Sequence, residues 1–290
     1  MKWKAIGFEP QNLEDIPLAA INPFRIIEED GKIGVEHYFT LQRKVIIPAK
    51  YDYIERKGVN TEIFFIVGAN KKYGVYNSEG KLIVDVIYDK IYIECENLIV
   101  VLKGKYRGAY DFEGNHIVPD KYADIWGHTS FIEVRCYNNK LGAYDYEGNH
   151  IMEDNCINLY PACFDDAHKK LLAFQISDGS NGLCDMNGKV IVPAKYTNIT
   201  LCENFIIADN SSCSVVYDYE GNQILPISTT YRYVNWIGKL ILQGTGNGTR
   251  VFDKTGKEIE PGMEYEDVFM QHDEFLAVKF KGQWKVLFSV

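Results

Sequence analysis

Short apolar runs alternate with polar turns along the chain at a nearly constant interval. Runs such as "LIVVLK", "FIEVRC", "FIIAD" and "FLAVKF" are each followed by a second strand-like segment, a tight turn and a third apolar segment such as "KLIV" or "KVIVP". Apolar segments of about four to eight residues between turn residues are typical of β-strands, and tight turns join neighbouring strands into meanders. The pattern therefore predicts a repeated three-stranded meander.

The motif G-[VA]-Y-D and its variants set the interval between the units, and they occur eight times. The first five glycines are spaced 34 to 40 residues apart, which is the period of a repeat architecture: Gly34, Gly74, Gly108, Gly142 and Gly182. A second landmark is an aromatic residue followed three positions later by an aliphatic one, with a cysteine in the fourth copy: Tyr51/Ile54, Tyr88/Ile91, Tyr122/Ile125, Cys156/Leu159, Tyr196/Ile199, Tyr231/Val234 and Tyr265/Val268. These pairs are predicted to form the crossover between units, with room for a very short fourth strand.

Six copies carry an Asp-x-x-Gly segment, or its Asn variant, that resembles a metal loop or a tight turn. The turn interpretation is favoured because the carboxylate can accept backbone N–H groups and the glycine supplies a positive φ. An EF-hand loop would need oxygen ligands at every second position and a glutamate at the twelfth, and these segments do not supply them. His116 and His150, which follow two of the turns, are expected to be solvated residues at strand ends.

The full unit, K-[YW]-G-[VA]-Y-D-x-x-G-[KN]-x-I-[VL]-P-x-x-Y-D-x-I, resembles the WG-repeat (KWG-repeat) proteins of bacteria. The resemblance covers residues ~24 to 290 and marks a diverged member, since the tryptophan position matches only at Trp284. Other copies have Ile33, Tyr73, Arg107, Leu141 and Asn181 there, and the glycine is replaced in the last three by Val215, Arg250 and Lys285. The resemblance implies an interaction or ligand-binding scaffold and transfers no catalytic residue.

Meanders of this size must stack on one another to bury their faces. We predict a single repeat domain over residues 1–290, most simply a closed β-propeller of about eight blades, with an open β-solenoid or spiral as the alternative. Residues 24–290 would carry the repeats, and residues 1–23 an N-terminal strand and linker. The segment "KWKAI" at 2–6 would supply the third strand that the last copy lacks and so close the ring.

Composition restricts the partners of the chain. The 290 residues are 46% apolar and carry a formal net charge of -9 without a Lys/Arg-rich run, which disfavours nucleic acid. The seven cysteines form no C-x-x-C pair and lie mostly in apolar runs, as buried thiols do in a reducing compartment. Without a secretory h-region or a membrane span of ~20 residues, the expected location is the cytoplasm, unless a signal peptide has been removed, and no membrane partner is expected.

Two groups of residues are candidates for a functional site. Asp165, Asp166 and His168 cluster in the irregular stretch 158–170 of the fourth copy, where they could bind a metal or do acid–base chemistry; a solvated loop is the favoured alternative. Trp126, His128 and Trp236 follow crossover segments and could form an aromatic floor for a sugar or peptide, or pack at sheet edges.

Most other acidic residues have structural explanations in the turns and crossovers. The sequence therefore favours a non-catalytic scaffold that binds a protein or small-molecule partner, as a monomer and without a metal or other cofactor. The alternative is a carbohydrate-active or other hydrolytic propeller, which would need two converging carboxylates. The sequence does not identify a ligand-binding residue.

Overall fold

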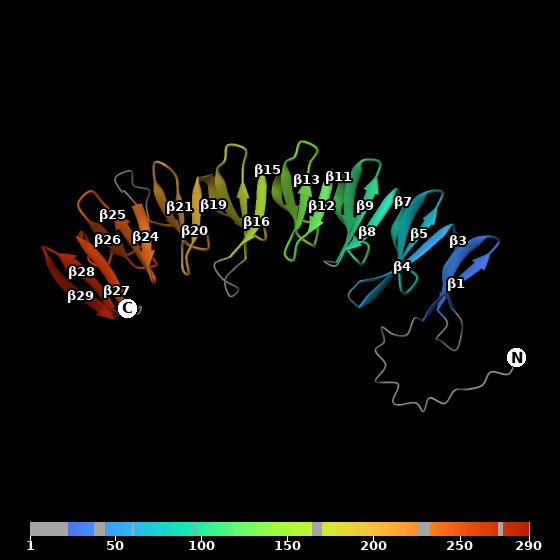
Figure 1. The fold of residues 1–290 in the computed structure, drawn as a ribbon, viewed down its shortest axis with the longest axis horizontal. Helices are drawn as coiled ribbons and strands as arrows, with labels where there is room; N and C mark the ends of the chain where they lie inside the picture. The colour runs from blue at the N-terminus through green and yellow to red at the C-terminus, as the bar shows by residue number, and fades with distance from the viewer. Residues whose placement is uncertain are drawn as a thin grey trace, which may run out of the picture. The chain divides into compact units, whose positions relative to one another are not determined.

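The computed structural model describes residues 23–37, 44–59, 61–94, 97–163, 170–225, 233–271 and 275–289. Every regular element in these ranges is a β-strand, and the strands form eight antiparallel sheets (Figure 1). Among the described residues, no helix is long and apolar enough to cross a membrane. The prediction of an all-β repeat protein is confirmed.

The chain divides into two compact units, residues 1–127 and 128–290. The first unit contains the strands β1 (Phe24–Glu29), β2 (Lys32–His37), β3 (Lys44–Tyr51), β4 (Tyr53–Val59), β5 (Glu62–Ala69), β6 (Lys72–Asn77), β7 (Leu82–Tyr88), β8 (Lys90–Glu94), β9 (Leu98–Lys103), β10 (Tyr106–Tyr110), β11 (His116–Tyr122) and β12 (Asp124–Gly127). Its sheets have the strand orders β1-β2-β3, β4-β5-β6-β7 and β8-β9-β10-β11.

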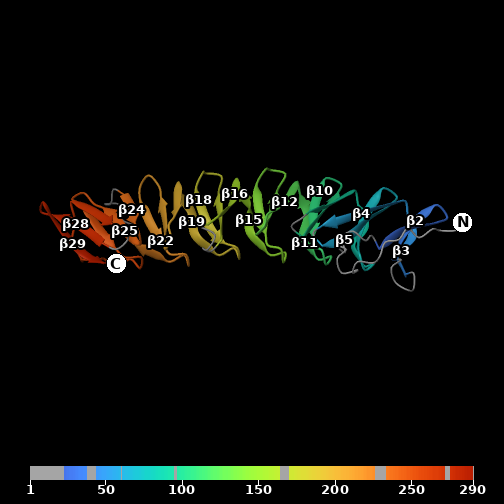
Figure 2. The ribbon, with the colours of Figure 1, turned by 60° about the horizontal axis from the view of Figure 1, so that its bottom comes forward.

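The second unit contains the remaining described strands, which are β13 (Ile132–Arg135), β14 (Leu141–Tyr144), β15 (His150–Cys156), β16 (Asn158–Ala162), β17 (Leu171–Gln175), β18 (Asn181–Asp185), β19 (Val190–Tyr196), β20 (Asn198–Leu201), β21 (Ile206–Asp209), β22 (Ser214–Tyr217), β23 (Gln223–Leu225), β24 (Tyr233–Ile237), β25 (Leu240–Gly244), β26 (Thr249–Phe252), β27 (Asp267–Gln271), β28 (Phe275–Phe280) and β29 (Gln283–Ser289). The remaining sheets of the chain have the strand orders β12-β13-β14-β15, β16-β17-β18-β19, β20-β21-β22-β23, β24-β25-β26 and β27-β28-β29. Successive strands of each meander lie side by side (Figure 2).

Five of the eight sheets have four strands, where the sequence predicted three with a very short fourth. The aromatic-x-x-aliphatic segment is the crossover between sheets, as predicted, and its aliphatic residue lies in the first strand of the next sheet. Tyr88 ends β7, and Ile91 lies in β8, which pairs with β9 over five residues. The chain stays extended after the tyrosine because its backbone groups find partners in the next apolar strand. Each sheet after the first therefore begins between the two residues of the landmark, which agrees with the predicted place of the landmark between sheets.

The repeated glycine allows an irregular pairing between the last two strands of a sheet. In the sheet β4–β7, Tyr73 pairs with Tyr88 and Val75 with Val84, so a two-residue step on β6 spans four residues of β7. A Cβ atom at Gly74 would lie 2.6 Å from the carbonyl oxygen of Val84. The bulged strand thus approaches β6 too closely for any side chain at this position.

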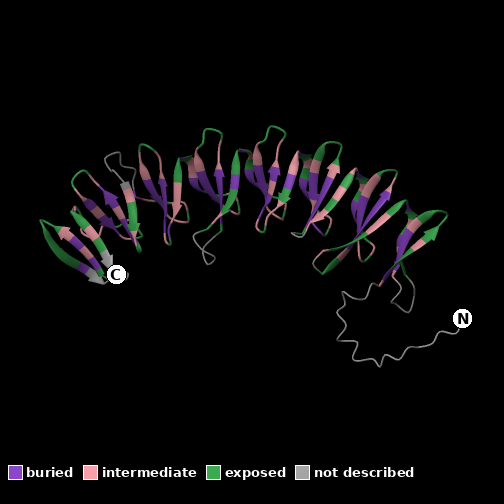
Figure 3. Ribbon diagram, viewed as in Figure 1, coloured by how far each residue is buried: buried purple, intermediate pink, exposed green. Residues whose placement is uncertain are grey.

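Neighbouring sheets within each unit share apolar cores, which lie mainly on the middle strands (Figure 3). Four sheets end in a buried tyrosine (Tyr51, Tyr88, Tyr122 and Tyr196), and in three of them its hydroxyl meets a tyrosine hydroxyl of the following sheet. Three such pairs are Tyr51 with Tyr76 at 2.8 Å, Tyr88 with Tyr110 at 2.7 Å, and Tyr196 with Tyr217 at 2.7 Å. Each pair gives a hydrogen-bond partner to two buried or half-buried hydroxyl groups that would otherwise destabilise the interface between sheets.

The fourth copy departs from this rule as its sequence indicates. Cys156 takes the place of the sheet-ending tyrosine and is fully buried. The position that carries Tyr110 in the third copy carries Cys184, which is buried in the same core as Cys156. Two small apolar thiols therefore replace two hydroxyl groups, and the interface needs no hydrogen bond at this point.

The Asp-x-x-Gly segments are turns, as predicted. Asp111 Oδ1 accepts the backbone N–H of Asn115 at 2.7 Å, and Gly114 has a φ of 93°. The turn also packs against the preceding sheet, since a Cβ atom at Gly114 would lie 2.7 Å from the carbonyl oxygen of Ile83. The same side-chain acceptor is present at Asn77, Asp145, Asp185, Asp218 and Asp253.

Candidate binding hollows

The acidic cluster predicted from the sequence, Asp165, Asp166 and His168, lies outside the described residues, in the connection between β16 and β17. Among the described residues, no group of three His, Cys, Asp or Glu side chains is placed to hold a metal ion. The functional role of the cluster therefore stays a hypothesis.

The three aromatic candidates lie on different elements. Trp126 is on β12 and is 37% exposed, and Trp236 is on β24 and is 43% exposed. His128 stacks on Phe131 with ring centroids 4.5 Å apart, and its Nε2 lies 3.3 Å from a carboxylate oxygen of Glu133. These contacts fix His128 by packing within its own hairpin, so the edge-packing alternative describes this residue better than a ligand floor.

The two histidines after the turns have more contacts than the sequence predicted. His116 is exposed, yet it stacks on Tyr110 at 4.4 Å and its Nε2 lies 3.0 Å from Asp120 Oδ1. His150 repeats the arrangement with Tyr144 and Asp154, at 4.5 Å and 3.0 Å. Both histidines therefore support the bulged edge of their sheets in addition to meeting solvent.

A hollow of about 340 Å³ opens between the sheet β4–β7 and the next strand, β8. We call it the Tyr73 hollow, and its lining residues are Tyr53, Glu55, Ile66, Tyr73, Asp89, Lys90, Ile91 and Tyr92. Tyr53 and Tyr73 meet edge to face, with ring centroids 5.9 Å apart. Tyr53 and Tyr92 are 42% and 46% exposed, so aromatic surface is available to a ligand here.

The carboxylate of Glu55 in this hollow already has two partners. Lys57 Nζ lies 2.8 Å from one oxygen, and the hydroxyl of Tyr53 donates to the other at 2.7 Å. The hydrogen bonds from Lys57 and Tyr53 lower the pKa of Glu55 below its usual range. Glu55 is therefore held as a carboxylate and is poorly suited to donate a proton.

Asp89 is held in the same way. Lys72 Nζ donates to its Oδ1 at 2.5 Å, and the backbone N–H of Gly104 donates to its Oδ2 at 2.7 Å. The hydrogen bond from Lys72, followed by that from Gly104, lowers the pKa of Asp89. Asp89 therefore fixes the start of β8 and, like Glu55, is an unsuitable general acid.

A second hollow, of about 210 Å³, lies at the corresponding place in the second unit, between the sheet β16–β19 and strand β20. We call it the Asn181 hollow, and its lining residues are Tyr160, Ala162, Ala173, Asn181, Gly182, Leu183, Asn198, Ile199 and Leu201. The strand registers equate Glu55 with Tyr160, because Glu55 pairs with Ile66 and Tyr160 pairs with Ala173. They likewise equate Tyr73 with Asn181 and Lys90 with Asn198.

A third hollow, of about 300 Å³, uses the same positions of the last described sheet. Phe269, Ala277 and Trp284 contribute to it, together with Asp267 and Val268. Trp284 is the tryptophan of the WG motif and is 53% exposed. The WG position therefore faces a hollow in three copies, as tyrosine, asparagine or tryptophan.

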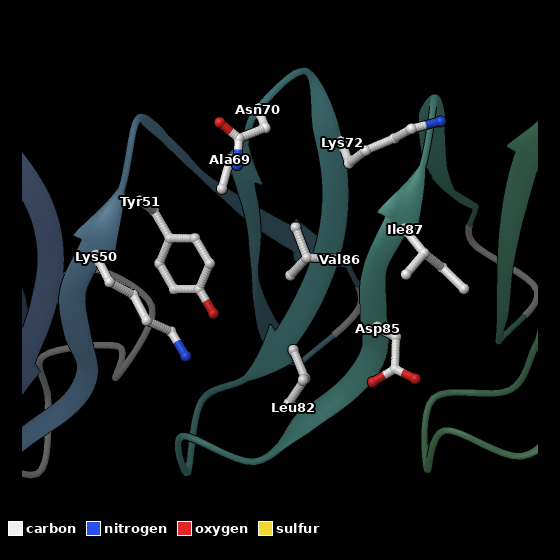
Figure 4. Close-up of a pocket in the computed structure, with 9 residues that line it drawn as sticks. All are labelled: Lys50, Tyr51, Ala69, Asn70, Lys72, Leu82, Asp85, Val86 and Ile87. Carbon is white, nitrogen blue, oxygen red and sulfur yellow. The ribbon is translucent and has the colours of Figure 1, made fainter.

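Another hollow, of about 490 Å³, lies on β3 and the hairpins of the sheet β4–β7 (Figure 4). Figure 4 shows Tyr51 directed toward Val86, whereas Lys72 extends away from Tyr51. The hydroxyl of Tyr51 is paired with Tyr76, and Lys72 is paired with Asp89. The polar side chains of this hollow therefore already have partners within the protein. This hollow is a weaker candidate for a binding site than the repeated hollows.

The repeated hollows were not predicted from the sequence. A usable signal was present, since the residue after the aliphatic landmark is aromatic in several copies: Tyr92, Trp126, Tyr160 and Phe269. All four are more than one-third exposed, although they follow a buried or half-buried aliphatic residue. Exposed aromatic residues that recur in register are a signal for a binding surface.

Comparison with protein families finds the WG-containing repeat over residues 73–106 and 182–205. The first segment begins at Tyr73 and the second directly after Asn181, so both include the WG position or its neighbour and run into the next sheet. A search of curated proteins finds no match.

Solved structures give weak similarities. The chain is 13% identical to the computationally designed Ika8 protein, with 93% of this chain and 94% of that chain covered and a TM-score of 0.26. It is 13% identical to Hsv2p of Kluyveromyces lactis (78% and 88% covered, TM-score 0.24) and 10% identical to the WD40 β-propeller domain of Doa1 (79% and 90% covered, TM-score 0.23). At these TM-scores the superpositions carry no argument about a shared fold.

Proposed function

Because the chain is a WG-repeat protein whose hollows recur in register, we propose that it is a non-catalytic scaffold that binds a protein or small-molecule partner. The recurrence of one hollow at the same repeat positions, with different side chains in each copy, is the observation that carries the proposal. A repeat fold can present such surfaces with little change to its core, because the exposed residues of the lining can vary while buried core residues such as Ala173 and Leu183 form the floor. We also propose that the protein acts as a monomer in the cytoplasm.

The state of the carboxylates supports binding over hydrolysis. A glycosidase needs a carboxylic acid with a raised pKa beside a second carboxylate. In the Tyr73 hollow, both Glu55 and Asp89 are hydrogen-bonded and have lowered pKa values. The lining of the Asn181 hollow contains no carboxylate among the described residues. A hydrolytic propeller therefore remains only the alternative to be tested.

The finer architecture is part of the same proposal. We propose that the sheets are blades of a closed β-propeller with about eight blades, and the alternative is an open spiral. The sheet β27-β28-β29 has three strands among the described residues, whereas β4–β7 has four. Residues 2–6, which lie outside the described residues, have the alternating pattern to supply the missing strand.

Deletion of residues 1–8 followed by hydrogen exchange tests the ring. In a closed ring, amides of 275–289 lose protection because a sheet edge becomes exposed. If those amides keep full protection and only residues 24–50 lose it, the closed propeller is wrong.

A paired screen tests the binding function. Chromogenic glycosides, esters and phosphates should give no turnover above background, and arrays of glycans and peptides should reveal at least one ligand class. Binding should weaken when exposed aromatic residues of the hollows, such as Tyr92 or Tyr160, are replaced by alanine. Turnover that disappears in Glu55→Gln or Asp89→Asn would instead assign the protein to the hydrolases.

A further inference from the structure

The Asn181 hollow has a floor and a rim of different chemistry. Ala173 and Leu183 are buried, and with Ile199 they form an apolar floor. Tyr160, which is 48% exposed, and the two asparagines at 181 and 198 form the polar part of the lining. A volume of about 210 Å³ is below the ~300 to 1,000 Å³ of pockets for drug-sized molecules, so the hollow suits a single ring.

The lining selects against charge. None of the described residues that line this hollow is Asp, Glu, Lys, Arg or His. An ionised ligand would lose hydration without gaining an ion pair, which costs free energy. An anion would in addition face a chain with a formal net charge of -9.

The two carboxamides select against a purely apolar ligand. Asn181 Nδ2 donates to the carbonyl oxygen of Thr197 at 2.9 Å, and Asn198 Nδ2 lies 3.4 Å from Thr200 Oγ1. Each contact uses one N–H donor of the carboxamide and so orients it. The second N–H donor and the acceptor oxygen of each carboxamide are then available to a ligand. A ligand without hydroxyl or amide groups would cover these atoms without satisfying them.

We propose that the Asn181 hollow binds one pyranose ring of a neutral carbohydrate, an inference that rests on the proposed binding function and names its ligand class. A sugar ring has an apolar C–H face and a rim of hydroxyl groups, and Tyr160 and the floor complement the face. The Asn181 and Asn198 carboxamides complement the hydroxyls, because each can both donate and accept a hydrogen bond. The Tyr73 hollow carries Glu55, Tyr73 and Lys90 at these positions and does not share this selectivity.

Saturation-transfer NMR and calorimetric titration with methyl glycosides test the inference on the full chain. The probes are the methyl pyranosides of glucose, galactose, mannose and N-acetylglucosamine, with methyl glucuronide and glucosamine as charged controls. At least one neutral probe should bind and the charged controls should bind more weakly. Absence of binding by every neutral probe would overturn the inference.

Three single substitutions each give the Asn181 hollow a residue that the Tyr73 hollow has at the same repeat position. Asn181→Tyr, Asn198→Lys and Tyr160→Glu each introduce the residue that the same position carries at 73, 90 or 55, so the repeat backbone tolerates it. Each should weaken the neutral sugar by roughly tenfold or more, because a hydrogen-bonding group or the ring platform is lost. A melting temperature equal to that of the unsubstituted protein shows that a variant is folded. If one variant does not fold, the other two test the proposal.

The matched control is the reverse change in the Tyr73 hollow. Tyr73→Asn and Lys90→Asn should leave sugar binding unchanged within about twofold, because the Asn181 hollow is untouched. If all three Asn181-hollow variants still bind sugar normally, the site is wrong even when binding is real.

The outcomes separate this inference from the proposed function. A peptide ligand found by the array, with no sugar binding, overturns the carbohydrate inference and leaves the scaffold function in place. Hydrolysis of a chromogenic glycoside overturns the scaffold function itself.

Discussion

The Tyr73 and Asn181 hollows occupy the same repeat positions and have different chemistry. The first is lined by Tyr53, Tyr73 and Tyr92 and contains carboxylates and a lysine, whereas the second has one tyrosine, two asparagines and an apolar floor. Their backbones correspond strand by strand in register. The comparison indicates that buried positions and turn glycines specify the repeat, while positions on the first and third strands of each sheet are free to change with the ligand.

Two features are common to both units. They are the tyrosines that pair their hydroxyl groups between sheets and the turn glycines that lie close to the backbone of the preceding sheet. Tyr88 and Tyr196 end their sheets in the same way, and each is hydroxyl-paired with a tyrosine of the next sheet. Gly114 and Gly188 both lie against the backbone of the preceding sheet, at 2.7 Å from a carbonyl oxygen for an added Cβ. Equal substitutions in the two units should therefore have equal effects on stability if the comparison is correct.

The turn glycines should give the largest effect. Gly114→Ala and Gly188→Ala each place a Cβ at positive φ and against backbone, so we expect a loss of about 2–3 kcal/mol in the free energy of unfolding. Denaturant unfolding measures the loss. A difference of more than about 1 kcal/mol between the two units would break the structural equivalence.

Gly179 is the control for this experiment, because its φ of 88° matches that of the turn glycines and no atom lies within 4 Å of an added Cβ. Gly179→Ala should cost only the backbone strain, about 1 kcal/mol. If it costs as much as Gly188→Ala, the close packing of the turn on the preceding sheet contributes nothing.

The tyrosine pairs should give a smaller, pH-dependent effect. Tyr88→Phe and Tyr196→Phe leave Tyr110 and Tyr217 without their hydroxyl partners, which should cost about 1 kcal/mol each at neutral pH. Denaturant unfolding of both variants at pH 7 should show equal losses, and a loss in only one unit would contradict the common interface.

Alkaline titration sharpens this prediction. Burial, and then the hydrogen bond between the paired tyrosines, raise the pKa of Tyr88 and Tyr196. The folded state therefore holds these protons more tightly than the unfolded state, whose tyrosines ionise near pH ~10. Stability from the pairs is complete below pH ~10 and falls as the pH rises above it, and the phenylalanine variants should show a shallower fall.

Acid titration should distinguish the two hollows. Asp89, whose pKa is lowered by Lys72 and Gly104, occupies the position of Thr197 in the second unit. Its contribution to stability is present above the unfolded pKa of ~3.9 and is lost as the pH falls through the lower folded value. Asp89→Asn should reduce the change in melting temperature between pH 7 and pH 3, and Thr197→Ala should leave that change as it is.

The sequence predicted the repeat well because its signals are local. The turn at Asp111 and Gly114 follows from side-chain acceptors and positive φ within five residues, and the buried Tyr88 and Cys156 follow from a fixed interval. The fourth strand was underestimated because β8 is a half-polar run, "KIYIE", whose pairing depends on the next apolar strand. Non-local pairing overrides a weak local pattern.

The hollows were missed for a different reason. They are formed between sheets, by residues such as Tyr73 and Lys90 or Asn181 and Asn198, which are about 17 positions apart and belong to different repeats of the pattern. Each of these polar positions is individually compatible with a solvated strand, so the pattern of residues alone does not rank them. Only the packing of successive sheets brings them together.

Thiol reactivity should give the smallest effect and can test whether the two units open independently. Cys163 is exposed, whereas burial raises the pKa of Cys156 to about 11 and that of Cys184 to about 12. Because the thiolate is the reactive form, Cys163 should be modified first by an aromatic disulfide reagent at pH 8, and the buried pair only when their core opens.

The rates of modification of the two buried cysteines are then compared between the Gly188→Ala and Gly114→Ala variants. An added Cβ at Gly188 presses on Ile151, which shares a core with Cys156 and Cys184, so Gly188→Ala should accelerate modification of both cysteines. Gly114→Ala strains the first unit at Ile83 and should leave those rates unchanged if the units open separately. Peptide mapping by mass spectrometry measures each rate. Equal acceleration by both variants would show that the units open as one, because strain in one unit would then reach the cysteines of the other.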